Sequence, residues 1–209
     1  MSNNIWAKYH LEKKAKEFEK FKSAAPKEVI SALEAIILKS KAISSEYTEK
    51  IDFVCELDAN AAMNFLIRKY EELMDCFSEH YAVDMTLLEK DGPALRLENQ
   101  IDGLLEYELR YLRDETQRKN EKNLIMNDFL SGKILSVDIR NKKFYDFAEQ
   151  LKRIEELEDE SHAVANKYQE VLSEIIAGLN FYTKDVLGKE LPDNPYEMDK
   201  IVAELKESL

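Results

Sequence analysis

The chain has 209 residues, of which 34% are charged and 44% are hydrophobic, with only five glycines and four prolines. This composition predicts long helices rather than sheets or disorder, in one large or two small domains. The net charge of −12 excludes a general nucleic-acid binder or anionic-membrane binder, because such proteins need clustered lysine and arginine.

The cysteines and the N-terminal residues bear on the compartment. Cys55 and Cys76 stand alone in the sequence, which is typical of buried thiols in a reducing compartment rather than of a disulfide framework. The N-terminal residues contain no apolar leader, and no stretch approaches the roughly 18 apolar residues of a membrane span. We therefore expect a cytoplasmic protein that does not insert into a membrane.

Apolar residues at helical spacing predict three helices in the first part of the chain. The first covers about residues 4–22, and Pro26 is typical of the first turn of the next helix. The second covers about 27–57, where Ser40 interrupts the apolar seam and is expected to fix its register. The third extends to Leu88 with Asp58 as its N-cap, unless the second and third form one bent helix.

A break at Asp91-Gly92-Pro93 separates these helices from the next one. That helix is predicted to run from about Ala94 to Ser131-Gly132. Tyr107 and Tyr111 lie one turn apart on it, and we expect them to pack against each other or against a neighbouring helix.

The last part of the chain contains the longest periodic run. A continuous helix over 137–187 would be about 75 Å long. Gly188 ends it, a loop follows over 188–195, and a short helix covers 196–209. Such lengths predict an elongated, coiled-coil-like all-α fold over residues 1–209, with two long antiparallel helical bundles that share helices.

Residue types that bind metals or carry out catalysis are scarce. His10, His80 and His162 are the only histidines. Asp159 precedes His162 by three residues, as in one limb of a dimetal helical bundle, but the sequence has no second limb. It also lacks a phosphate-binding glycine loop and a Gly-x-Ser-x-Gly sequence. We therefore expect an exposed His162, no metal, no cofactor and no enzymatic activity.

The stretch from Glu174 to Gly188 contains the candidate binding residues. Phe181 lies off the apolar stripe of this helix, about 100° around the axis from Tyr182. A helical side chain leans over the residues three and four positions earlier, which here are the small Gly178 and Ala177. This arrangement predicts an apolar depression beside Phe181, unless Phe181 belongs to a second packing seam. The stripe itself consists of Tyr168, Val171, Leu172, Ile175, Leu179, Tyr182 and Val186.

Several segments, in the same order, resemble the V domain of the Alix family of ESCRT-associated adaptors. Ala177-Gly-Leu-Asn-Phe-Tyr182 is similar to the family's Gly-x-x-Phe-Tyr signature, near the end of its last long helix. The segment from Ser78 to Leu95 resembles the part of the family that leads to the crossing between two arms. Residues 105–118 resemble the following helix, and residues 31–57 an early arm helix. The resemblance implies a V-shaped arrangement of two arms, with the crossing here near 91–94.

The resemblance also implies a function. In that family the phenylalanine lines a hydrophobic pocket for the tyrosine of Tyr-Pro-x-Leu peptides, and the matching residue here is Phe181. Gly178 and Ala177 would make room for the ring, and Asp185, one turn further, would accept the tyrosine hydroxyl. Ubiquitin and ESCRT components are further implied partners, with association at endosomes. Gly188 stands where the family has another apolar wall residue.

Two other classes of protein also use long helices. A BAR-like scaffold, acting on membranes or as a coiled-coil dimer, fits the chain length but needs a basic concave face. The interleaved acidic and basic residues disfavour such a face. A helical-bundle metalloenzyme would need metal ligands that the sequence does not supply.

Overall fold

The computed structural model describes residues 9, 12, 24–54, 58–88, 92–192 and 194–209. Within these residues every regular element is a helix, which confirms the predicted all-α class. The helix predicted over 4–22 lies outside the described residues except for Tyr9 and Glu12, which are helical. Cys55 and His10 also lie outside them. The helices are α3 (Pro26–Val54), α4 (Ala59–Leu88), α5 (Pro93–Glu108), α6 (Glu115–Leu130), α7 (Lys142–Tyr182), the π-helix η1 (Thr183–Leu187) and α8 (Pro195–Glu207).

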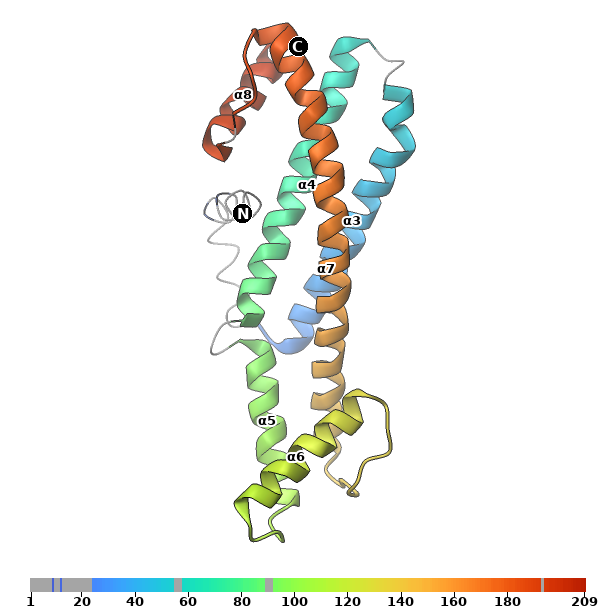
Figure 1. The fold of residues 1–209 in the computed structure, drawn as a ribbon, viewed down its shortest axis with the longest axis vertical. Coiled ribbons are helices and arrows are strands. Elements are labelled where there is room, and N and C mark those ends of the chain that lie inside the picture. The colour runs from blue at the N-terminus through green and yellow to red at the C-terminus, as the bar shows by residue number, and fades with distance from the viewer. Residues whose placement is uncertain (1–8, 10–11, 13–23, 55–57, 89–91, 193) are drawn as a thin grey trace.

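Helix α7 extends along most of the length of an elongated molecule (Figure 1). Helices α3 and α4 pack along the C-terminal part of α7, and we call this group the upper bundle. Helices α5 and α6 pack along the N-terminal part of α7 and form the lower bundle. Helix α4 is followed by α5 in nearly the same direction, so the chain passes from the upper to the lower bundle between Leu88 and Pro93. Helix α8 packs on α4 and η1 at the end of the upper bundle.

Several predicted helix ends are confirmed. The Asp58 carboxylate accepts a hydrogen bond from the Ala61 amide at 2.9 Å, as expected of an N-cap. Helix α5 begins at Pro93, directly after Gly92. Gly188 ends the η1 segment with a φ of 61°, a left-handed conformation that favours glycine. Helices α3 and α4 are antiparallel, so they are two helices and not one bent helix (Figure 1).

The single helix predicted from Ala94 to Ser131-Gly132 is wrong. Helix α5 ends at Glu108, and α6 begins at Glu115. The Asp114 carboxylate accepts a hydrogen bond from the Gln117 amide at 2.7 Å and caps the new helix. The Arg118 guanidinium donates to the Leu112 carbonyl at 2.5 Å. These bonds replace the backbone bonds of a continuous helix, and α6 folds back onto α7.

The long helix predicted over 137–187 begins later than expected and changes from an α-helix to a π-helix near its end. Asn141 accepts a hydrogen bond from the Lys143 amide at 3.1 Å, so helix α7 begins at Lys142. Its backbone then continues without a break into the π-helix η1. Gly188 ends the run at the predicted place.

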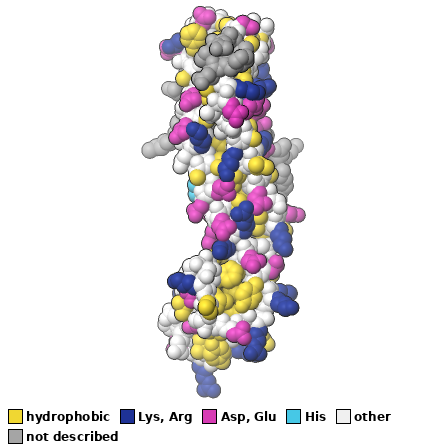
Figure 2. Space-filling view, turned by 90° about the vertical axis from the view of Figure 1, so that its right-hand side faces the viewer, with side chains coloured by type: hydrophobic (Ala, Val, Ile, Leu, Met, Phe, Trp, Pro, Cys, Tyr) yellow, Lys and Arg dark blue, Asp and Glu magenta, His cyan; other side chains and the backbone are white. Residues whose placement is uncertain are grey.

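The predicted stripe of α7 forms the core of the upper bundle. Tyr168, Val171, Ile175 and Leu179 are buried, whereas Val186 at the end of the stripe is 42% exposed. Ser40 of α3 is fully buried and donates to the Ile36 carbonyl at 2.6 Å, within its own helix. Acidic and basic side chains are interspersed along one face of the molecule, and hydrophobic side chains gather toward its lower end (Figure 2).

Two buried polar side chains lie inside the upper bundle. His80 of α4 is 3% exposed, contacts the Ser161 hydroxyl of α7 and meets the Tyr168 ring edge-on at 6.2 Å. Lys69 of α4 is 1% exposed, and its ammonium group lies against the carboxylates of Glu46 and Glu72. Both groups therefore have polar partners, as buried polar groups require.

Candidate functional site

Phe181 lies in the last turn of α7, and its side chain is 66% exposed. It meets the half-buried Tyr182 edge to face, with ring centroids 5.4 Å apart. Ala177, four residues earlier on the same face of the helix, is also exposed. Phe181 therefore does not belong to a second packing seam, and with Ala177 it forms an exposed apolar patch.

Gly178 faces in a different direction from Phe181. A Cβ atom added to Gly178 would lie 2.8 Å from Cδ1 of Leu66 in α4. The space expected on the Gly178 side is therefore filled by Leu66, a buried core residue. Gly178 lets α7 approach α4 closely, and the free surface beside Phe181 lies on the Ala177 side.

The backbone beyond Phe181 is a π-helix, which was not predicted. Its hydrogen bonds join residues five apart, so the α-helical spacing that paired Phe181 with Asp185 does not hold unchanged. Asp185 is exposed, and Thr183 is fully buried and donates to the Leu179 carbonyl at 2.7 Å. Single-turn π segments occur frequently at functional sites, which adds to the interest of this end of α7.

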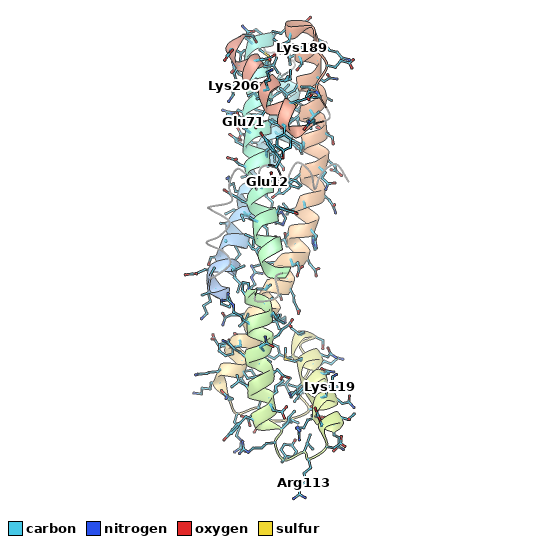
Figure 3. All side chains as sticks on the ribbon, turned by 90° about the vertical axis from the view of Figure 1, so that its left-hand side faces the viewer. Glu12, Glu71, Arg113, Lys119, Lys189 and Lys206 are labelled. Atoms are coloured by element: carbon cyan, nitrogen blue, oxygen red, sulfur yellow. The ribbon has the colours of Figure 1, made fainter. Side chains whose placement is uncertain are left out.

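Hydrogen bonds and ion pairs hold the surroundings of this patch in place. The Asn180 side chain accepts a hydrogen bond from the Leu191 amide at 3.1 Å and ties the loop after η1 to α7. Lys189 pairs with Glu204 of α8 at 2.6 Å. Lys206 of α8 pairs with Glu71 of α4 at 2.5 Å, and these side chains lie at the upper end of the molecule (Figure 3). The patch therefore lies on a part of the bundle whose elements are held together by side-chain contacts, and not on a long loop.

The other aromatic pair singled out in the sequence behaves differently from the prediction. Tyr107 and Tyr111 are each 61% exposed, so neither packs into a core. Helix α5 ends at Glu108, which removes the helical spacing that would bring the two rings together. The Arg110 guanidinium lies 3.9 Å from the centre of the Tyr107 ring. These tyrosines belong to the lower end of the molecule, far along the chain from Phe181.

The residues considered for metal binding are not grouped. His162 is exposed, as expected, whereas His80 is buried in the upper bundle. In the part of the chain that the structure describes, no three His, Cys, Asp or Glu side chains are placed to hold a metal ion. Cys76 is a free, buried thiol, and burial raises its pKa.

Sequence reasoning missed a groove between α3 and α7, about 460 Å³ in volume. Its walls are made by hydroxyl-bearing residues of α3 and by Ala163 and Val164 of α7. The small neighbouring residues Ser44 and Ser45 are the feature of α3 that leaves room for it. The sequence does not show which residues of α7 stand opposite this pair, so the groove could not be predicted.

These features define an elongated, all-helical protein with an exposed apolar patch at one end and a groove on its side. Comparison with models of known protein families, with curated proteins and with solved structures gives no match. Among the described helices, none has a stretch long and apolar enough to cross a membrane.

Proposed function

We propose that this chain is a non-catalytic adaptor that binds tyrosine-containing peptides of the Tyr-Pro-x-Leu type at Phe181. The observation that carries the proposal is the 66% exposure of Phe181 at the end of the longest helix, where the ordered resemblance to the Alix V domain places the peptide-binding phenylalanine. A large aromatic side chain exposed at this site is available to a partner.

The chemistry of the patch suits a tyrosine ring. Aromatic rings prefer edge-to-face or offset contact and contribute about 0.5–1.5 kcal/mol beyond their buried area. Ala177 leaves room on one side of Phe181, and the exposed Asp185 carboxylate is the proposed acceptor for the tyrosine hydroxyl. Gly188 offers no apolar wall, so the peptide contacts a shallow patch and its affinity depends strongly on Phe181.

The wider role follows from the same resemblance. In this proposal the upper and lower bundles correspond to the two arms of a V-like domain. The protein acts in the cytoplasm and at endosomes, where it joins peptide-bearing cargo to ESCRT components and to ubiquitin. Such an adaptor needs no metal or cofactor.

A titration with a fluorescein-labelled Tyr-Pro-x-Leu peptide, followed by fluorescence anisotropy, tests the proposal. The unmodified chain should bind the peptide, and Phe181→Asp should weaken binding by at least about tenfold, because it places a charge where the tyrosine ring must be buried. Tyr107→Asp is the matched control, since Tyr107 has a similar exposure of 61% but lies in the lower bundle. Equal binding by the Phe181 variant and the unmodified chain would contradict the proposal.

A further inference from the structure

Helices α3 and α7 are parallel neighbours joined by a regular series of ion pairs. The Lys27 ammonium lies 3.5 Å from the Asp146 carboxylate, and the Arg153 guanidinium lies 2.6 Å from the Glu34 carboxylate. The Lys41 ammonium contacts the Glu160 carboxylate. The partners in each pair are 119 residues apart, and successive pairs follow every seven residues, the period of a coiled-coil seam. The sign alternates, so the basic residue comes from α3, then α7, then α3.

The series stops at its next position. Seven residues after Lys41 and Glu160 come Thr48 of α3 and Lys167 of α7. The alternation of sign would place an acidic residue opposite Lys167, but Thr48 is uncharged and donates its hydroxyl hydrogen to the Ser44 carbonyl at 2.9 Å. Lys167 instead lies 3.1 Å from Glu170 of its own helix, in a pair that is exposed to solvent and therefore weak.

The groove between α3 and α7 opens at this point. It lies between the last ion pair, Lys41 with Glu160, and Lys167. Ser45 and Thr48 on one wall and Ala163 on the other are too small to fill the space between the two helices. A volume of about 460 Å³ is within the usual size range of ligand pockets.

Ser44 gives a second, independent sign that the groove takes a ligand. Its side chain lines the groove and is 6% exposed. Within the described part of the chain, its Oγ atom has no hydrogen-bond partner. A buried hydroxyl without a partner costs free energy, and a polar group entering the groove would remove that cost.

We propose that the α3–α7 groove is a docking site for an amphipathic helix of a protein partner, which inserts apolar side chains between α3 and α7 and places a carboxylate that pairs with Lys167 and accepts a hydrogen bond from the Ser44 hydroxyl. The groove covers residues 41–48 of α3 and 160–167 of α7, so its first and last residues are seven positions apart on each helix. The anchors of a helix bound in a groove, at positions i, i+3 or i+4 and i+7, have the same span. The partner carboxylate supplies the acidic residue that Thr48 does not.

This site is separate from the proposed peptide site. Lys167 and Phe181 are both in α7, and their separation of 14 positions corresponds to about 21 Å along the helix. An adaptor with both sites could hold two partners at the same time. Failure of one site leaves the other untouched, so each can be tested alone.

The test uses two helical peptides that differ in one residue. Both carry leucine at positions i, i+4 and i+7 on an alanine-rich background. One has glutamate and the other glutamine at the position that faces Lys167. The glutamate peptide should bind the full chain about two- to fivefold more tightly, which is the usual range for an exposed ion pair. Lys167→Glu should reverse this preference, which a merely apolar contact would not do.

Two neighbouring variants show whether the peptide occupies the groove. Ala163→Arg fills the groove and should weaken binding of the glutamate peptide by at least about tenfold. His162→Arg is the matched control, because His162 is also exposed and adjacent in sequence but does not line the groove. Circular dichroism of both variants checks that the fold is retained.

Three results would overturn the proposal. The first is that neither peptide binds at millimolar concentration, and the second is that both arginine variants bind the glutamate peptide as the unmodified chain does. The third concerns the chain without peptide: sedimentation that shows a dimer, lost only in Ala163→Arg, would assign the groove to a second copy of the chain.

Discussion

The buried His80 ties the stability of the upper bundle to pH. Burial lowers its pKa to about 4, and the nearby His162 adds to this effect. In the unfolded chain the same group titrates near 6.5. As the pH falls, His80 therefore takes up a proton in the unfolded state before it does so in the folded state. The contribution of neutral His80 to the stability of the fold is complete above pH 6.5 and is lost as the pH falls toward 4.

We expect the free energy of unfolding to fall by roughly 3 kcal/mol over that pH range because of His80 alone. Urea denaturation at several pH values measures the change. His80→Gln should remove this part of the pH dependence, whereas His162→Gln, at an exposed position, should largely keep it. An unchanged pH profile for His80→Gln would show that another group is responsible.

The buried Lys69 depends on its two acidic partners. Hydrogen bonds from Lys69 and Lys50 lower the pKa of Glu46 to about 2. Glu46→Gln leaves the Lys69 ammonium with the Glu72 carboxylate at 2.7 Å as its remaining carboxylate partner, and should destabilise the fold by about 1–3 kcal/mol. Lys69→Met removes the buried charge itself and should change stability by less than about 1 kcal/mol. Thermal melting of both variants compares them, and a larger loss in Lys69→Met would contradict this reasoning.

Two glycines inside helices differ in the space around them, and only Gly178 lies where α7 packs on α4. Gly103 of α5 is exposed and has no neighbouring atom within 4 Å of an added Cβ, whereas Gly178 faces Leu66. Gly103→Ala should stabilise the fold by about 0.5–1 kcal/mol through helix propensity. Gly178→Val should destabilise it by about 1–3 kcal/mol, because the side chain must displace a buried leucine. Chemical denaturation measures both, and a fully stable Gly178→Val would mean that the two helices do not pack closely there.

At the scale of elements, the sequence predicts helices well where one strong local signal sets an end. Asp58, Gly92-Pro93 and Gly188 mark real boundaries, because capping oxygens, proline and left-handed glycine act through their own backbone. The break between α5 and α6 was missed because apolar residues at helical spacing continue on both sides of it. Asp114 is the N-cap of α6, but the sequence contains so many acidic residues that nothing marks this one as a capping residue.

The site was less predictable than the helices. The exposure of Phe181 follows from its position off the apolar stripe, and the structure agrees with that reasoning. The role of Gly178 could not be predicted, because the sequence does not say which residue of α4 lies opposite. The groove beside Lys167 could not be predicted for the same reason, because it lies between α3 and α7. The sequence likewise contains no sign of the π-helix after Tyr182.

At the scale of the whole molecule, helix α7 links two bundles stacked along one axis (Figure 1). The exposed Phe181 lies near the C-terminal end of α7, and the groove between α3 and α7 lies on the side of the upper bundle. An elongated molecule of this kind would keep the two proposed binding surfaces at a nearly constant distance, because tightly packed helices resist deformation. This geometry is well suited to an adaptor that holds more than one partner.

The most direct test of the proposed function is to map where the peptide binds. A Tyr-Pro-x-Leu peptide with p-benzoylphenylalanine in place of its tyrosine is cross-linked to the full chain by light, and the product is digested with trypsin. We predict cross-links in the fragment from Tyr168 to Lys184, which contains Ala177 and Phe181, and their loss in Phe181→Asp. Cross-links confined to other fragments, or no specific cross-link, would contradict the assignment of Phe181 as the peptide site.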